Sequence, residues 1–227
     1  MPRITLGIDV YGTLIDPGGV VDRLRTHVGE RAEAVAAVWR RTQLAYSFRR
    51  GLMQAYVPFS QVTQEALAFA LAHERLDLSE AAQADVVASY ASLPAFPDAE
   101  TGLAALDRAV FRVYAFSNGR ADDVDAVLRH AGLRDAFDGV VSVEPVRVFK
   151  PSPAVYAHFR RASGAGGGPA WLISGNPFDV LGAQAAGLHG CWVRRDPASV
   201  FDPWGVSPTL TVPSLSGVGA AILACPV

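Results

Sequence analysis

The sequence is poor in cysteine and almost devoid of lysine. Its two cysteines, Cys191 and Cys225, make neither a disulfide framework nor a metal-ligand cluster. Lys150 is the one lysine, no run of basic residues is present, and the formal net charge is −2, so neither a nucleic-acid nor an anionic-membrane partner is supported. No apolar stretch is long enough to cross a bilayer, and no separate signal segment is recognisable. We therefore expect a globular protein of the reducing cytoplasm.

Apolar, β-rich runs recur along the chain with helical segments between them, which predicts an α/β fold. The chain is 50% hydrophobic and 19% charged, so it can bury one core domain plus a modest insertion. Strands are expected at residues 4–9, 111–116, 140–143, 171–174, 190–193 and 210–212. Helices are expected at residues 20–28, 30–49, 61–75, 79–90, 99–109 and 121–131. The first four of these helices follow one another without a strand and indicate a helical insertion.

Polar residues follow four of the expected strands. Asp9 ends the first strand, and Ser117-Asn118-Gly119 follows the second. Phe149-Lys150-Pro151 lies downstream of the third, and Ser174-Gly175-Asn176-Pro177-Phe178-Asp179 follows the fourth. Ligands of open parallel sheets bind beyond the carboxyl ends of the strands. Each group alone could be a helix cap, a turn or a surface cation, but their order and spacing together favour a single site.

The stretch Asp9-Val10-Tyr11-Gly12-Thr13-Leu14 resembles the nucleophile motif of the haloacid dehalogenase superfamily, and the four groups follow the superfamily's motif order over almost the whole chain. Most members carry Asp-x-Asp-x-Thr, whose second Asp is a general acid, whereas Tyr11 stands there in this chain. Superfamily phosphatases also hold Mg²⁺ with Gly-Asp-x-x-x-Asp, and here Gly175 replaces the first metal carboxylate. A departing halide needs an electropositive cradle rather than a proton. The pattern therefore resembles the 2-haloacid dehalogenases and implies an enzyme without metal or cofactor.

The expected helical insertion carries a second motif. Trp39-Arg40-Arg41-Thr42-Gln43-Leu44-Ala45-Tyr46 resembles the dehalogenase segment Trp-Arg-x-x-Gln-Leu-x-Tyr, whose arginine receives the departing halide. This match implies that role for Arg40 and not for Arg41. The alternative is an exposed helical arginine that forms a surface ion pair.

The resemblance also implies which side chains surround the substrate. Tyr11, Leu44 and Phe59 would form an apolar wall around its alkyl group, although ordinary core packing would use the same residue types. Phe178 stands where relatives often have Trp, so the size of the pocket is left open. Tyr156 matches a family tyrosine near the hydrolytic network, and a plain core tyrosine is the alternative.

The substrate implied by the resemblance, a small 2-haloalkanoate, is itself an anion. Lys150, the Ser117 hydroxyl and backbone amides, including that of Val10, are expected to bind its carboxylate. Asn118 is expected to lie beside the departing halide.

Asp9 would attack C2 of the substrate in line and expel halide toward Arg40, leaving an aspartyl ester. Backside attack implies inversion, so an (S)-2-haloacid gives an (R)-2-hydroxyacid. Water would then attack the carbonyl carbon of Asp9, with Asp179 as base or orienter and with Ser174 and Asn176 in the hydrogen-bond network.

The implied architecture is a Rossmann-like core of residues 1–15 and 96–227 that carries a helical cap of residues 16–95. Relatives commonly dimerise through cap helices, so a homodimer is expected, with the 2-haloacid and halide as the other partners. Three alternatives stay open. They are a hydrolase of another small α-substituted carboxylate such as a strained-ring amino acid, a Mg²⁺-dependent phosphatase, and a non-catalytic sensor of a small carboxylate.

Overall fold

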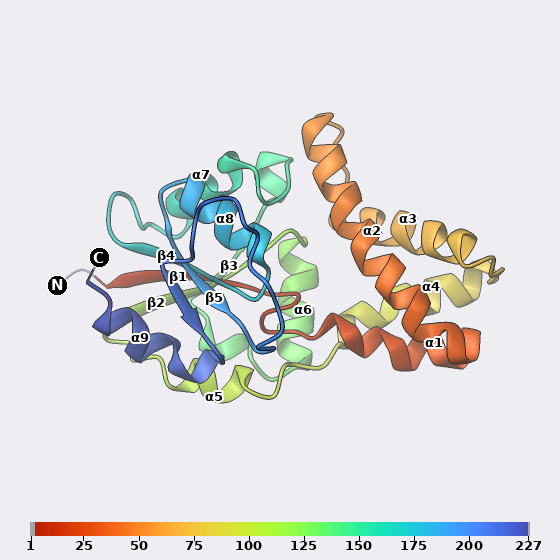
Figure 1. Cartoon of the computed structure of the whole chain (residues 1–227), viewed down its shortest axis with the longest axis horizontal. Helices are drawn as coiled ribbons and strands as arrows, with labels where there is room; N and C mark the ends of the chain where they lie inside the picture. The colour runs from red at the N-terminus through yellow and green to blue at the C-terminus, as the bar shows by residue number, and fades with distance from the viewer. Residues whose placement is uncertain (1–2, 227) are drawn as a thin grey trace.

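The structure, a computed structural model, describes residues 3–226. Within this range six parallel strands form one sheet in the order β3-β2-β1-β4-β5-β6, with β1 between β2 and β4 (Figure 1). The strands are β1 (Ile4–Asp9), β2 (Phe111–Ser117), β3 (Gly139–Ser142), β4 (Ala170–Ser174), β5 (His189–Val193) and β6 (Leu210–Val212). This order is that of a doubly wound sheet, in which ligands bind beside the first strand where the winding reverses. The predicted α/β, Rossmann-like fold is confirmed.

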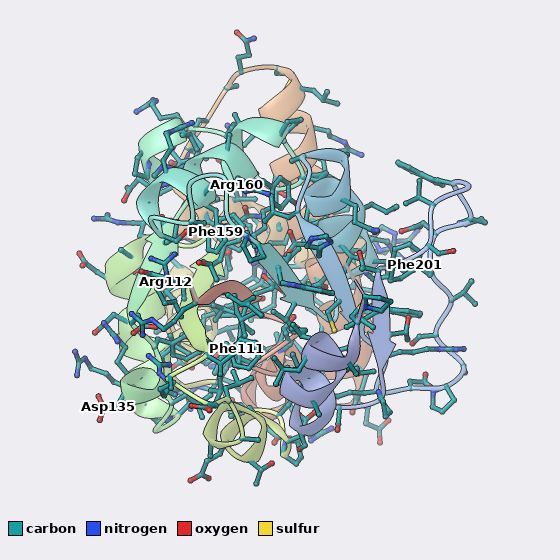
Figure 2. The ribbon with its side chains drawn as sticks, turned by 90° about the vertical axis from the view of Figure 1, so that its left-hand side faces the viewer. Phe111, Arg112, Asp135, Phe159, Arg160 and Phe201 are labelled. Atoms are coloured by element: carbon teal, nitrogen blue, oxygen red, sulfur yellow. The ribbon has the colours of Figure 1, made fainter. Side chains whose placement is uncertain are left out.

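The central strands are almost continuously apolar because helices cover both faces of the sheet. One face packs against α5 (Ala99–Ala104), α6 (Ala121–His130) and α9 (Val218–Ala224), and the other against α7 (Pro153–Ala162) and α8 (Pro177–Ala185). Figure 2 shows Phe111 and Phe159 within these two layers of core. Both faces of the sheet are therefore packed against helices, and this packing positions the ends of the strands.

One helix is shorter than its predicted range. The pattern predicts a helix over residues 99–109, but α5 ends at Ala104. The prediction is wrong after that point because Asp107 turns the chain: its Oδ1 accepts the N–H of Ala109 at 2.8 Å, and its carbonyl accepts the N–H of Val110 at 3.0 Å. Side chains of this type compete with the helix for backbone groups.

The predicted helical insertion lies beside the carboxyl ends of the strands (Figure 1). It contains α1 (Val20–Val28), α2 (Ala32–Leu52), α3 (Phe59–His73) and α4 (Glu80–Ala88), followed by a 3₁₀ turn, η3 (Ser89–Ser92). In the part of the chain that the structure describes, no helix combines the length and the apolar character needed to cross a membrane.

The chain enters and leaves this helical part through two adjacent segments. Ile15 and Ala95 form an antiparallel bridge, and the N–H of Asp16 donates to the carbonyl of Pro94 at 2.9 Å. The predicted domain boundaries, between residues 15 and 16 and between residues 95 and 96, fall in these two segments. The division into two domains stays a prediction.

Candidate active site

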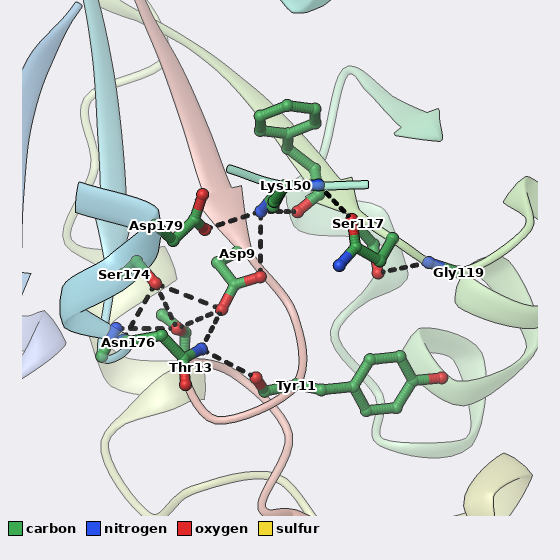
Figure 3. A network of polar contacts seen from close by, with 12 residues as sticks. Asp9, Tyr11, Thr13, Ser117, Gly119, Lys150, Ser174, Asn176 and Asp179 are labelled. Atoms are coloured by element: carbon green, nitrogen blue, oxygen red, sulfur yellow. Dashed lines mark hydrogen bonds and ion pairs between the residues drawn. The ribbon is translucent and has the colours of Figure 1, made fainter. Parts of the chain in front are cut away.

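Asp9 ends β1, and its carboxylate is held by side chains from distant parts of the chain (Figure 3). Its Oδ1 accepts a hydrogen bond from Lys150 Nζ at 3.0 Å. Its Oδ2 accepts from Thr13 Oγ1 at 2.9 Å, Ser174 Oγ at 3.2 Å and Asn176 Nδ2 at 2.7 Å. Only 7% of the residue is exposed. The carboxylate is thus fixed in one orientation and largely shielded from bulk water.

Lys150 is a buried ammonium with three acceptors for its three donors. Besides Asp9, Nζ donates to Asp179 Oδ2 at 2.7 Å and to the carbonyl of Phe116 at 2.9 Å. Burial by itself lowers the pKa of Lys150, but the adjacent carboxylates of Asp179 and Asp9 outweigh it and raise the pKa above its usual value. Lys150 therefore stays charged and partly neutralises both acids.

Asp179 lies behind Lys150, in the first turn of α8. Its Oδ1 accepts a hydrogen bond from Tyr156 Oη at 2.7 Å. Burial raises the pKa of Asp179 to about 6, the Lys150 charge opposes this rise, and the charge of Asp9 adds to it. Asp179 can therefore exchange a proton near neutral pH.

A magnesium site of the superfamily phosphatase type does not fit these residues. A Cβ built on Gly175 would lie 2.4 Å from the carbonyl oxygen of Gly12, so no carboxylate side chain fits there without a backbone shift. The ammonium of Lys150 bridges Asp9 and Asp179. Across residues 3–226, no group of three or more His, Cys, Asp or Glu side chains could hold a metal ion.

A cavity of about 20 Å³ opens at Asp9 between the sheet and the helical part. Its walls combine charged, polar and aromatic side chains, all of which belong to the predicted site. They are Asp9, Tyr11, Arg40, Leu44, Phe59, Ser117, Asn118, Lys150, Asn176 and Phe178. Residues of the helical part and residues of the part that contains the sheet therefore meet at the carboxylate of Asp9.

The other predicted residues lie outside this cavity lining. Ser174 bonds Asp9 from the end of β4, and Asp179 and Tyr156 are fully buried behind Lys150. The side chain of Val10 is packed in the hydrophobic core. Tyr156 thus contacts the Asp179 carboxylate, and Val10 has only its backbone to offer a ligand.

Arg40 faces the cavity from α2, whereas Arg41 is exposed on the outer side of the same helix. Arg40 Nη1 donates to Gln43 Oε1 at 2.9 Å, and Nη2 donates to the carbonyl of Tyr11 at 3.3 Å. Gln43 Nε2 in turn donates to Thr63 Oγ1 at 2.7 Å. This chain of bonds presents the Gln43 oxygen to Arg40 and holds the guanidinium toward Asp9.

Two hydrogen bonds shape the end of β2. The Ser117 hydroxyl accepts the N–H of Gly119 at 3.1 Å. Asn118 Oδ1 accepts the N–H of Lys150 at 2.9 Å, which ties the Lys150 loop to this strand end. Because the Asn118 oxygen is used in this way, its NH₂ group is the end available to the cavity.

Three residues of the site were not predicted. Thr13 donates to Asp9 and accepts the N–H of Gly175 at 2.8 Å, and it could have been found as the Thr of the Asp-x-Tyr-Gly-Thr motif. Gln43 stands within the Trp-Arg-x-x-Gln pattern and could also have been assigned. Thr63 belongs to no motif, and only the packing of α3 against α2 reveals it.

Comparisons with known proteins agree with this geometry. Residues 5–187 match the family described as haloacid dehalogenase-like hydrolase. The (S)-2-haloacid dehalogenase of Pseudomonas sp. (strain YL) is 37% identical, and the match covers 94% of this chain and 91% of that protein. The (S)-2-haloacid dehalogenase of Xanthobacter autotrophicus is 40% identical, and the match covers 82% of this chain and 73% of that protein. The structure of the L-2-haloacid dehalogenase from Xanthobacter autotrophicus with chloropropionic acid covalently bound has a TM-score of 0.92 and 32% identity, and the match covers 98% of this chain and 99% of that one. The chain belongs to the haloacid dehalogenase superfamily, within its branch of (S)-2-haloacid dehalogenases.

Proposed function

We propose that the protein hydrolyses small (S)-2-haloalkanoic acids to (R)-2-hydroxyacids through an aspartyl ester, without a metal ion. One observation carries the proposal: the carboxylate of Asp9 is neutralised by the buried Lys150 and faces a second cation, Arg40, across a cavity. The names of its relatives and the covalent chloropropionic acid complex of a similar enzyme support the same chemistry.

In the first step an oxygen of Asp9 forms a bond to C2 as the carbon–halogen bond breaks. Arg40 and the NH₂ group of Asn118 receive the halide, because cationic and N–H donors stabilise the developing negative charge. Lys150 and Ser117, with the backbone amide of Val10, bind the substrate carboxylate.

Four apolar side chains surround the reacting carbon in this proposal: Tyr11, Leu44, Phe59 and Phe178. They exclude bulk water, which strengthens the electrostatic interactions within the cavity.

In the second step water attacks the carbonyl carbon of the Asp9 ester. The bond from this carbon to the product oxygen breaks as that oxygen takes the second proton of the water, the hydroxyacid leaves, and Asp9 is restored as a carboxylate with one oxygen from water. Ser174 and Asn176 hold the carbonyl group, and Asp179, oriented by Tyr156, takes up the proton that water loses.

The pH dependence of the second step tests the role of Asp179. A base acts only when it is deprotonated, so we expect the rate of ester hydrolysis to fall as the pH drops through the pKa of Asp179. Esterification removes the Asp9 charge that helps to raise this pKa, so the acid limb should lie below the value of about 6 that holds while Asp9 is ionised. Tyr156 donates to the charged form of this acid, so Tyr156→Phe should raise that pKa and shift the acid limb to higher pH. Single-turnover rates measured against pH check both effects; an acid limb that does not move in Tyr156→Phe would assign the limb to another group.

The proposed function is tested by measuring halide release from (S)-2-chloropropionate in the presence of a chelator. Parallel assays use p-nitrophenyl phosphate with Mg²⁺ and a strained-ring amino acid. Chelator-resistant halide release supports the proposal. Phosphate release that needs Mg²⁺ would assign a phosphatase, and turnover of the amino acid alone would assign the other hydrolase.

We also propose that the protein forms a homodimer through the outer face of α2 and α3. Phe69 is 44% exposed there and packs edge-on against Tyr46, with Arg41 and Arg49 beside them. Sedimentation velocity of the wild type and of Phe69→Glu tests this assembly. A cytoplasmic location is likewise proposed, and the two free cysteines support it.

A further inference from the structure

A second cavity adjoins the one at Asp9. Its volume is about 190 Å³, against about 20 Å³ for the catalytic cavity. Tyr11 and Phe59 line both cavities, so the two spaces meet at these rings. The larger space lies where the end of α4, η3 and the start of α3 face α6.

The chemistry of the second cavity is that of an apolar subsite. Val87, Ala88, Ala91 and Ala126 contribute small apolar side chains beside the two shared rings, and the three alanines are exposed, so the cavity opens to the surface. The lining also includes hydroxyl groups, those of Ser60, Thr63 and Tyr90. Among the described residues that line it, Asp123, exposed on α6, is the one charged group. A cavity without a cation offers no partner to an anionic head group, and apolar walls favour hydrocarbon.

The two cavities also differ in how much they can hold. A site needs roughly 10–15 Å³ to hold one water molecule, so the cavity of about 20 Å³ at Asp9 holds about one water molecule and has no room for an alkyl chain. The carboxylate and the halogen of a substrate must stay beside Lys150 and Arg40. The larger cavity begins at Tyr11 and Phe59, so it is the adjoining space into which a longer chain on C2 can extend.

Given the proposed function, on which this inference depends, we propose that the second cavity binds the alkyl chain at C2. The enzyme then prefers medium-chain 2-haloacids, such as 2-halohexanoates, to 2-halopropionate. Asp123 disfavours chains that end in a second carboxylate, because like charges repel.

The experiment compares kcat/KM for halide release from (S)-2-bromopropionate, (S)-2-bromobutanoate and (S)-2-bromohexanoate. The wild type should gain about fourfold per methylene, since burial of one CH₂ contributes ~0.8 kcal/mol. Ala91→Phe, which places a ring at the exposed edge of the cavity, should lower the hexanoate-to-propionate ratio by about tenfold or more. Ala81→Phe, at an exposed alanine of α4 outside the cavity, is the matched control and should keep the ratio.

Asp123→Lys provides an independent variant at an exposed position, where folding is not at risk. It should raise the activity on 2-bromohexanedioate relative to 2-bromohexanoate. A wild type without preference for the longer chain, or an unchanged ratio in Ala91→Phe, would overturn the proposal. An equal loss on all three substrates would also overturn it, by making the cavity an entry route. Absence of halide release from every substrate would instead refute the proposed function itself.

Discussion

Replacement of Asp9 by Asn is expected to abolish halide release, because an amide oxygen is a poor nucleophile and carries no charge for Lys150 to orient. The fold should survive with reduced stability. Asn keeps the volume and an oxygen that can accept hydrogen bonds from Thr13, Ser174 and Asn176, but its NH₂ group then replaces the oxygen that accepts from Lys150. Halide release under single-turnover conditions, together with thermal unfolding of the variant, checks both expectations.

The same loss would follow if Asp9 only activated a water molecule that attacks C2 directly, so oxygen labelling must separate the two routes. In ¹⁸O-water with enzyme in excess, the ester route delivers an unlabelled oxygen of Asp9 to the first hydroxyacid product. The label then appears in the peptide that contains Asp9. Labelled product on the first turnover with an unlabelled peptide would rule out the covalent intermediate.

Arg40→Ala is expected to lower kcat by about 10²–10³, the usual cost of losing one preorganised group that stabilises transition-state charge. Arg40 is held toward the cavity by Gln43 and the carbonyl of Tyr11, so its donors need no reorganisation during the reaction. The loss should be larger for chloride than for bromide, because chloride is the poorer leaving group and depends more on the positive charge that stabilises it.

Arg41→Ala is the matched control for this prediction. Arg41 is the next residue of α2 but lines a groove on the outer surface, so its removal should leave kcat close to that of the wild type. If Arg41→Ala lost as much activity as Arg40→Ala, the assignment of halide binding to Arg40 would be wrong.

Several features of the site follow from the sequence because they depend on local order. A buried apolar run that ends in Asp9 predicts a strand that delivers a carboxylate to the edge of a sheet. The order of the groups at Ser117, Lys150 and Asp179 identifies the superfamily, and Gly175 indicates the missing metal ligand. The Trp-Arg-x-x-Gln pattern likewise separates Arg40 from Arg41.

Tertiary structure alone decided how these groups share charge and space. Lys150 stands 141 positions after Asp9 in the chain, and only the folded sheet places its ammonium between two buried carboxylates and thereby sets the pKa of Asp179. Gln43, which accepts a hydrogen bond from Arg40, donates one to Thr63, and this second bond depends on the packing of α3 against α2, which no local pattern encodes. The same holds for the two cavities that meet at Tyr11. Their shape is set by side chains from both parts of the chain, and a sequence motif specifies residue types but not the volume left between them.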